Sequence, residues 1–141
     1  LQIGDTRQNK TDMKLTEDER RALMNYRFEK ADHAITEAED LAKLGHWSLV
    51  AQRLYYAAYY VASAKLLEKG VSAKSHTGVI SLVNCHCVKE GTLTRDDAHT
   101  YMRLFEMRQS GDYDDYFDHT EQDVAPYIAL TKDLIKKLKL Q

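Results

Sequence analysis

The sequence predicts an all-α fold, an antiparallel up-and-down four-helix bundle with an additional helix. A single proline and six glycines in 141 residues favour helices over strands and turns. Apolar residues recur at helical spacing in five segments, and no stretch alternates apolar and polar residues as a strand does. Short links between these segments favour antiparallel neighbours. The length suits one domain, which we place at residues 16–141, after an N-terminal extension over residues 1–15.

The first two helices are expected at about residues 17–44 and 47–69. Thr16 and Glu19 match a capping box, in which each side chain pairs with a free backbone amide. Gly45 is a natural stop for the first helix. The second helix carries apolar residues and tyrosines around most of its circumference, which is typical of a helix at the centre of a bundle or in an interface. We therefore expect a central helix and a homodimer.

Two more helices have candidate caps. Ser75 is placed to cap a helix over about residues 76–89. Thr94 and Asp97 resemble a second capping box, which opens a helix that should fray near Gly111.

The start of the last helix is less regular. Thr120 and Asp123 are both candidate caps. Pro126 suits the first turn if Asp123 is the cap, but it would remove an interior hydrogen bond if Thr120 is the cap. We expect a short irregular turn or a kink there.

Composition excludes several classes of protein. Lys and Arg number 20 against 22 Asp and Glu, and the net charge of −2 argues against a protein that mainly coats nucleic acid. No apolar run approaches the roughly 18 residues of a membrane span, and the polar N-terminus does not resemble a signal peptide. Two cysteines, Cys85 and Cys87, do not make a disulfide scaffold. We expect a reduced, cytoplasmic protein without a membrane partner.

The main candidate site lies where the fourth helix should end, in the segment RQSGDYDDY. Arg108 can direct five donors into a cleft where phosphate would bind, and Asp112, four residues on, could hold the guanidinium in place. The alternative is an ordinary Arg–Asp pair that fixes the helix end. Asp112 and Asp114 could also hold Mg²⁺, although a solvated acidic loop before a helix is the simpler interpretation.

Lys74 and His76 form a smaller candidate cluster on either side of Ser75. A cation and an imidazole at a helix N-terminus can hold an anion, although both side chains could equally be solvated. The sequence Cys85-His86-Cys87 is a weak zinc signal, because residues two apart on a helix do not face one another. We therefore predict no metal site.

The second helix contains several tyrosines at helical spacing. With Arg53 they form one aromatic group, Tyr55, Tyr56, Tyr59 and Tyr60, which is expected to be core or a dimer face with hydroxyls reaching polar partners. Such tyrosines can also stack on a nucleotide base.

Three strings in order resemble the HEPN family, small prokaryotic helical domains often paired with a minimal nucleotidyltransferase. The strings are RLYYAAYYVASAKLLEKG, KSHTGVISLVNCHCVKEG and LFEMRQSGDYDDYF, and the resemblance covers roughly residues 22–139. It implies an up-and-down four-helix bundle with an extra helix, which dimerises through a helical face. It also implies a role in toxin–antitoxin or nucleotide-linked systems.

The chain departs from the family at one motif. The resemblance implies a family in which many members are ribonucleases that use an Arg, four to six intervening residues and a His. Arg108 matches the Arg, but Tyr113, Asp114 and Asp115 occupy the His positions, and His119 is too far along. RNA cleavage needs a group that shuttles a proton near neutral pH, whereas Tyr titrates at about 10 and Asp at about 4. The resemblance therefore implies a variant that is not a nuclease and has no catalytic residues.

The expected function is binding of a nucleotidyltransferase partner, of a nucleotide, or of both, in a toxin–antitoxin-like system. Arg108 would contact the anion, Asp112 would orient it, Tyr113 would line the cleft, and Lys74 and His76 would add a second anion contact. Two alternatives remain: a ribonuclease toxin with an atypical active site, and a helical scaffold protein. RNA is the less favoured ligand, and a nucleotide is the one cofactor-like molecule expected.

The resemblance also implies a modification site. In related pairs the nucleotidyltransferase can transfer AMP to a tyrosine close behind the Arg–His motif. Tyr113 and Tyr116 hold that position here.

Overall fold

The all-α prediction is confirmed by the computed structural model, which describes residues 15–113 and 118–140, without the side chains of residues 112 and 113. No strand occurs within these residues. The helices are α2 (Glu17–Lys43), α3 (Trp47–Glu68), α4 (His76–Lys89), α5 (Arg95–Tyr113), α6 (Glu121–Val124) and α7 (Pro126–Lys139).

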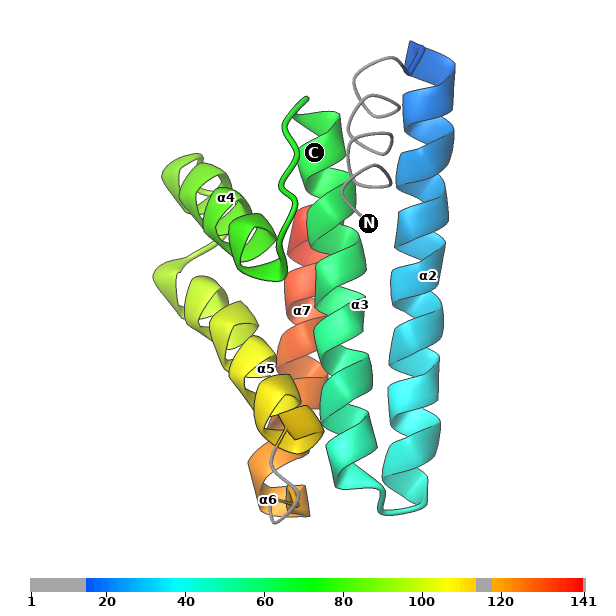
Figure 1. Ribbon diagram of the computed structural model, residues 1–141, viewed down its shortest axis with the longest axis vertical. Coiled ribbons are helices and arrows are strands. Elements are labelled where there is room, and N and C mark those ends of the chain that lie inside the picture. Colours follow the sequence, from blue (N-terminus) through cyan, green and yellow to red (C-terminus); the bar gives the residue numbers. More distant parts are fainter. Residues whose placement is uncertain (1–14, 114–117, 141) are drawn as a thin grey trace.

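Helices α2, α3, α5 and α7 form the bundle, and α4 is the additional helix (Figure 1). Along the chain these four helices alternate in direction, as expected for an up-and-down arrangement, with α5 inclined to the others. Helix α4 packs on α3 and α5 at one end of the molecule. The predicted boundaries of the first three helices agree with the structure to within one residue.

Helix α3 is central, as predicted from its apolar circumference. It packs against α2, α4, α5, α6 and α7, and twelve of its 22 residues are buried. Its longest contact is with α2, whose buried face consists of three fully buried alanines and Ile35. Such small side chains let two helix backbones approach closely. Lys65 of α3 is also buried. Its ammonium has partners there, since it pairs with Glu68 at 3.0 Å and donates to the Leu140 carbonyl at 3.1 Å.

The predicted caps form as expected. The Glu19 amide donates to Thr16 Oγ1 at 3.1 Å, and the Thr16 amide donates to the Glu19 carboxylate at 3.0 Å. At the start of α4 the Gly78 amide donates to Ser75 Oγ at 2.9 Å. These bonds satisfy amides that the first turn of a helix leaves without partners.

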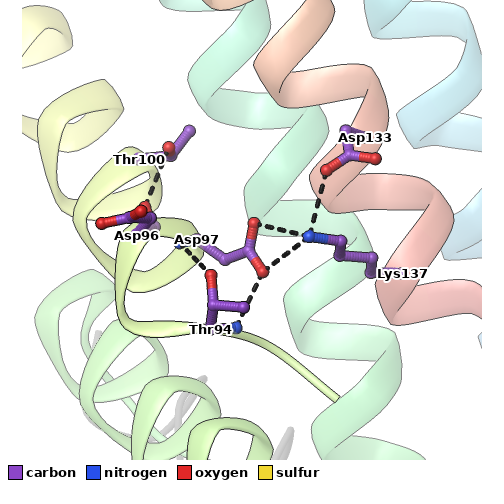
Figure 2. Close-up of polar contacts among 6 residues, drawn as sticks. All are labelled: Thr94, Asp96, Asp97, Thr100, Asp133 and Lys137. Atoms are coloured by element: carbon purple, nitrogen blue, oxygen red, sulfur yellow. Dashed lines mark hydrogen bonds and ion pairs between the residues drawn. The ribbon is translucent and has the colours of Figure 1, made fainter. Parts of the chain in front are cut away.

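The cap of α5 also joins two helices (Figure 2). Thr94 and Asp97 exchange backbone–side-chain bonds of 2.8 and 3.1 Å. Lys137 of α7 donates to both oxygens of the Asp97 carboxylate, at 3.0 and 3.1 Å, and pairs with Asp133 at 3.2 Å. Asp97 is therefore both a helix cap and a link between α5 and α7.

The described part of helix α5 extends past Gly111 to Tyr113, whereas we expected fraying near Gly111. The His119 ring lies against this end of the helix, and its Nε2 is 2.7 Å from the Met107 carbonyl. Because a carbonyl only accepts, Nε2 carries the proton and donates it. This bond stabilises the last turns of α5.

The irregular start of the last helix is confirmed. Thr120 caps the single turn α6 with Asp123 as its capping-box partner. Ala125 separates α6 from α7, and Pro126 stands at the start of α7, where its missing amide costs no helical bond. Both candidate caps therefore take part in one capping box.

Candidate functional site

Side chains from helices α3, α4 and α5 lie together in what we call the tyrosine–arginine cluster. Its members are Tyr55, Tyr56 and Tyr59 of α3, His76 at the start of α4, and Arg108 of α5. From the sequence alone these residues belong to three separate candidate groups. The structure brings Arg108, His76 and the tyrosines together.

Tyr55 and His76 form the polar centre of the cluster. The Tyr55 hydroxyl lies 2.6 Å from His76 Nδ1, and Tyr55 has no exposed surface. Burial raises the pKa of Tyr55 well above its ordinary value of 10, although the charge of Arg108 opposes this. Burial and then the charge of Arg108 lower the pKa of His76 below 6.5. At neutral pH both groups are therefore uncharged.

Arg108 supplies the fixed positive charge. Its guanidinium carbon lies 5.5 Å from the centre of the Tyr55 ring and 5.3 Å from that of Tyr56. A cation over an aromatic face is attracted by the ring quadrupole. The two rings therefore hold the guanidinium beside His76 while Arg108 remains only partly buried.

Stacked rings complete the cluster. The Tyr59 and His76 rings stack with centres 4.5 Å apart and planes 26° apart. Burial raises the pKa of Tyr59, and the charge of Arg27 opposes this. Arg53 lies 5.2 Å from the Tyr56 ring and pairs with Glu37 at 3.5 Å. Because Tyr56 and Tyr59 are only half-buried, they offer partly exposed aromatic surface beside the guanidinium.

Two residues of α5 near the cluster were not predicted. The rings of Tyr101 and Phe105 lie 6.3 and 5.8 Å from that of Tyr55. Tyr101 is fully buried, and its hydroxyl has no hydrogen-bond partner among the described residues. Both residues lie on the same face of α5 as Arg108, at helical spacing, and this spacing was the signal that could have identified them.

The other predicted site residues have different outcomes. Lys74 is exposed in the link before α4. The side chains of Asp112 and Tyr113, and the whole of Tyr116, lie outside the described residues. The Arg108–Asp112 pair and the modified tyrosine therefore stay predictions.

The two cysteine side chains of the Cys-His-Cys sequence lie in different environments. Cys85 is exposed and Cys87 is buried, and burial raises the pKa of the Cys87 thiol. Nowhere in residues 15–113 and 118–140 do three His, Cys, Asp or Glu side chains come together in a way that could hold a metal ion. Within the same residues, no helix has the length and apolar character needed to cross a membrane.

Comparisons with known proteins agree on the family. The HEPN domain family matches residues 24–141. A "UPF0332 protein" of Thermotoga maritima is 32% identical over 123 residues, which cover 85% of this chain and 93% of the relative. A second "UPF0332 protein", from Archaeoglobus fulgidus, is 31% identical over 78% of this chain and 85% of its own length.

A further relative carries a functional name. It is the Methanocaldococcus jannaschii protein "Putative toxin MJ0142", 28% identical over 62% of this chain and 59% of its own length. The family match covers α2 from residue 24 onward, the rest of the bundle and all five members of the tyrosine–arginine cluster. The chain belongs to the HEPN domain family.

Proposed function

We propose that this HEPN protein is not a nuclease and binds the phosphate of a nucleotide at the tyrosine–arginine cluster, within a toxin–antitoxin-like system. The observation that carries the proposal is the guanidinium of Arg108, held over two tyrosine rings beside His76. Guanidinium groups bind phosphate through paired charge-assisted hydrogen bonds. The toxin name of one relative supports the biological setting.

The cluster suits a nucleotide because a charge and an aromatic surface lie side by side. Arg108 would contact the phosphate, while the half-buried rings of Tyr56 and Tyr59 would stack against the base. Stacking of a base on an aromatic side chain contributes about 1–3 kcal/mol and is tolerant of base identity. Lys74, exposed just before α4, would add a further cation, and Asp112 and Tyr113 follow Arg108 at the end of α5.

Binding measurements with a matched pair of arginine variants test this proposal. AMP and ATP are titrated by calorimetry into the wild type, Arg108→Ala and Arg103→Ala. Arg103 is on the same helix, but it is exposed, and among the described residues it pairs with Glu106 at 3.8 Å. Loss of a charge-assisted contact predicts binding at least about tenfold weaker in Arg108→Ala, with Arg103→Ala unchanged. Equal binding by a folded Arg108→Ala protein would remove the site.

A ribonuclease with an atypical site is the second candidate, favoured by one observation. His76 lies at the cluster with Arg108 and is uncharged near neutral pH, so it offers the proton acceptor that the residues after Arg108 lack. The same wild-type preparation is therefore incubated with single-stranded RNA. We expect no cleavage; cleavage that disappears in both His76→Gln and Arg108→Ala would establish the nuclease instead.

We also propose a homodimer and a nucleotidyltransferase partner. Tyr26 is 56% exposed and Tyr60 is half-buried, and Lys30 lies over both rings, at 5.4 and 4.8 Å. This aromatic face of α2 and α3 is the surface we expect a second copy to cover. Light scattering should give twice the 16.3 kDa of one chain, and Tyr60→Glu should shift the protein to the monomer.

Purification from the source cells, with intact-mass analysis, tests for the nucleotidyltransferase partner and for AMP on Tyr113 or Tyr116.

A further inference from the structure

The tyrosine–arginine cluster contains two groups that can carry positive charge, and only one of them carries it in the free protein. Arg108 is charged at all physiological pH values. His76 is beside it, and the charge of Arg108 is one of the two causes that hold His76 in its neutral form, after burial. An anion bound at Arg108 would offset that repulsion and favour a proton on His76.

Because of Tyr55, His76 can gain a proton without a change in the geometry of the cluster. Its hydroxyl is 2.6 Å from His76 Nδ1, and a hydroxyl can donate to a neutral nitrogen or accept from a protonated one. The hydrogen bond therefore survives when His76 gains its proton. The stack of His76 on Tyr59 keeps the ring in place in both states.

The groups facing His76 come from each element packed against it. Helix α3 contributes the rings of Tyr55, Tyr56 and Tyr59, and α5 contributes the charge of Arg108. Burial raises the pKa of Tyr55 and of Tyr59, so both hydroxyls stay neutral near pH 7. His76 Nε2 has no hydrogen-bond partner within the described residues, so it is available to donate to a ligand. Protonation of His76 thus adds one positive charge to a site that already holds one.

We propose that the cluster selects the terminal phosphate of a nucleotide, a dianion, over a phosphodiester, a monoanion, because the dianion draws a proton onto His76. Tyr55 is the positioning residue for this step. This inference rests on the proposed nucleotide site and names its ligand class: a phosphate monoester with a free end, not the internal linkage of a nucleic acid. A monoester loses its second proton at about pH 6, so near pH 7.5 the ligand brings two negative charges to two positive groups.

A pair of ligands that differ in one charge tests the selection. AMP and its 5′-methyl ester share base and sugar, and each is titrated into wild type, His76→Gln and His99→Gln at pH 7.5. His99 is an exposed histidine of α5 and is the matched control. One added charge-assisted hydrogen bond predicts a preference of about tenfold or more for AMP in wild type and His99→Gln. In His76→Gln the preference should fall to about twofold or less, the remainder expected from Arg108 alone.

Proton uptake on binding reports protonation of His76, and a purely structural role of His76 would not change it. Titrations in two buffers of different ionisation enthalpy should show up to one proton taken up with AMP, less with the methyl ester, and none in His76→Gln. Tyr55→Phe keeps the ring under Arg108 but removes the hydroxyl, so it should reduce the uptake while the protein stays folded. The carbon chemical shift of the His76 ring, followed by NMR, should show its pKa rising when AMP binds.

The possible outcomes distinguish failure of terminal-phosphate selection from failure of the proposed nucleotide site. If both ligands bind wild type equally, or if His76→Gln keeps the preference, terminal-phosphate selection is overturned and nucleotide binding stands. If neither ligand binds wild type, both are overturned. A preference for AMP that is lost together with proton uptake in His76→Gln supports the inference.

Discussion

Replacing Tyr101 with phenylalanine should stabilise the protein. The Tyr101 side chain is fully buried against Tyr55, and its hydroxyl has no partner among the described residues. Burial also raises the pKa of Tyr101 well above 10, so the hydroxyl stays neutral and uncompensated. A buried polar group without a hydrogen bond costs about 1–3 kcal/mol. Tyr101→Phe removes that cost and keeps the ring, so we expect a gain of about 1–2 kcal/mol.

The gain is large enough to measure by two methods. Unfolding entropy of about 2.1 cal/mol/K per residue gives about 0.3 kcal/mol/K for this length, so Tm should rise by about 3–7 °C. The urea midpoint should rise without a change in slope. Tyr26→Phe, at an exposed position where the contact with Lys30 needs only the ring, should change neither value. A lower midpoint for Tyr101→Phe beside an unchanged Tyr26→Phe would show that the hydroxyl has a partner and refute the reasoning.

Three further predictions concern stability. Thr131→Val should raise the free energy of unfolding by about 1 kcal/mol, because Thr131 is fully buried and its Oγ1 has no partner among the described residues; a urea curve with a lower midpoint would contradict this. At Asp97 burial raises the pKa, but bonds from Thr94 and Lys137 outweigh it and lower the pKa below 3.8. Its contribution is complete above pH 3.8 and lost as the pH falls through the folded pKa, so wild type should lose more stability than Asp97→Asn between pH 5 and pH 3, measured by calorimetry. Gly45→Ala should lower the free energy of unfolding by about 1 kcal/mol, because φ is +75° and a Cβ there meets nothing within 4 Å; an unchanged Tm would contradict the backbone argument.

Much of the fold could be predicted because its signals are local. Thr16, Ser75 and Thr94 each accept a bond from an amide three residues on, so caps can be identified without knowledge of tertiary structure. The end of α5 could not be predicted in this way. Beside Gly111 the His119 ring bonds to the Met107 carbonyl from another part of the chain, a contact that local sequence does not indicate.

The site was predicted as parts and not as a whole. Arg108, His76 and the α3 tyrosines were each identified from residue type, but their meeting depends on how α4 and α5 pack against α3. Sequence spacing holds no information on that packing. The same limit applies to His76, whose sequence position predicts only a minor anion contact, because its bond to the Tyr55 hydroxyl joins two different helices.

The central position of α3 determines how its amide hydrogens exchange with solvent. Every other described helix packs against α3, so its middle turns should exchange only through global unfolding, as the slowest amides of a domain do. Tyr55, Tyr56 and Tyr59 stand on those turns. The proposed binding surface therefore lies on the segment expected to be the most protected of the described residues, and a ligand bound there would slow exchange across the whole bundle by mass action.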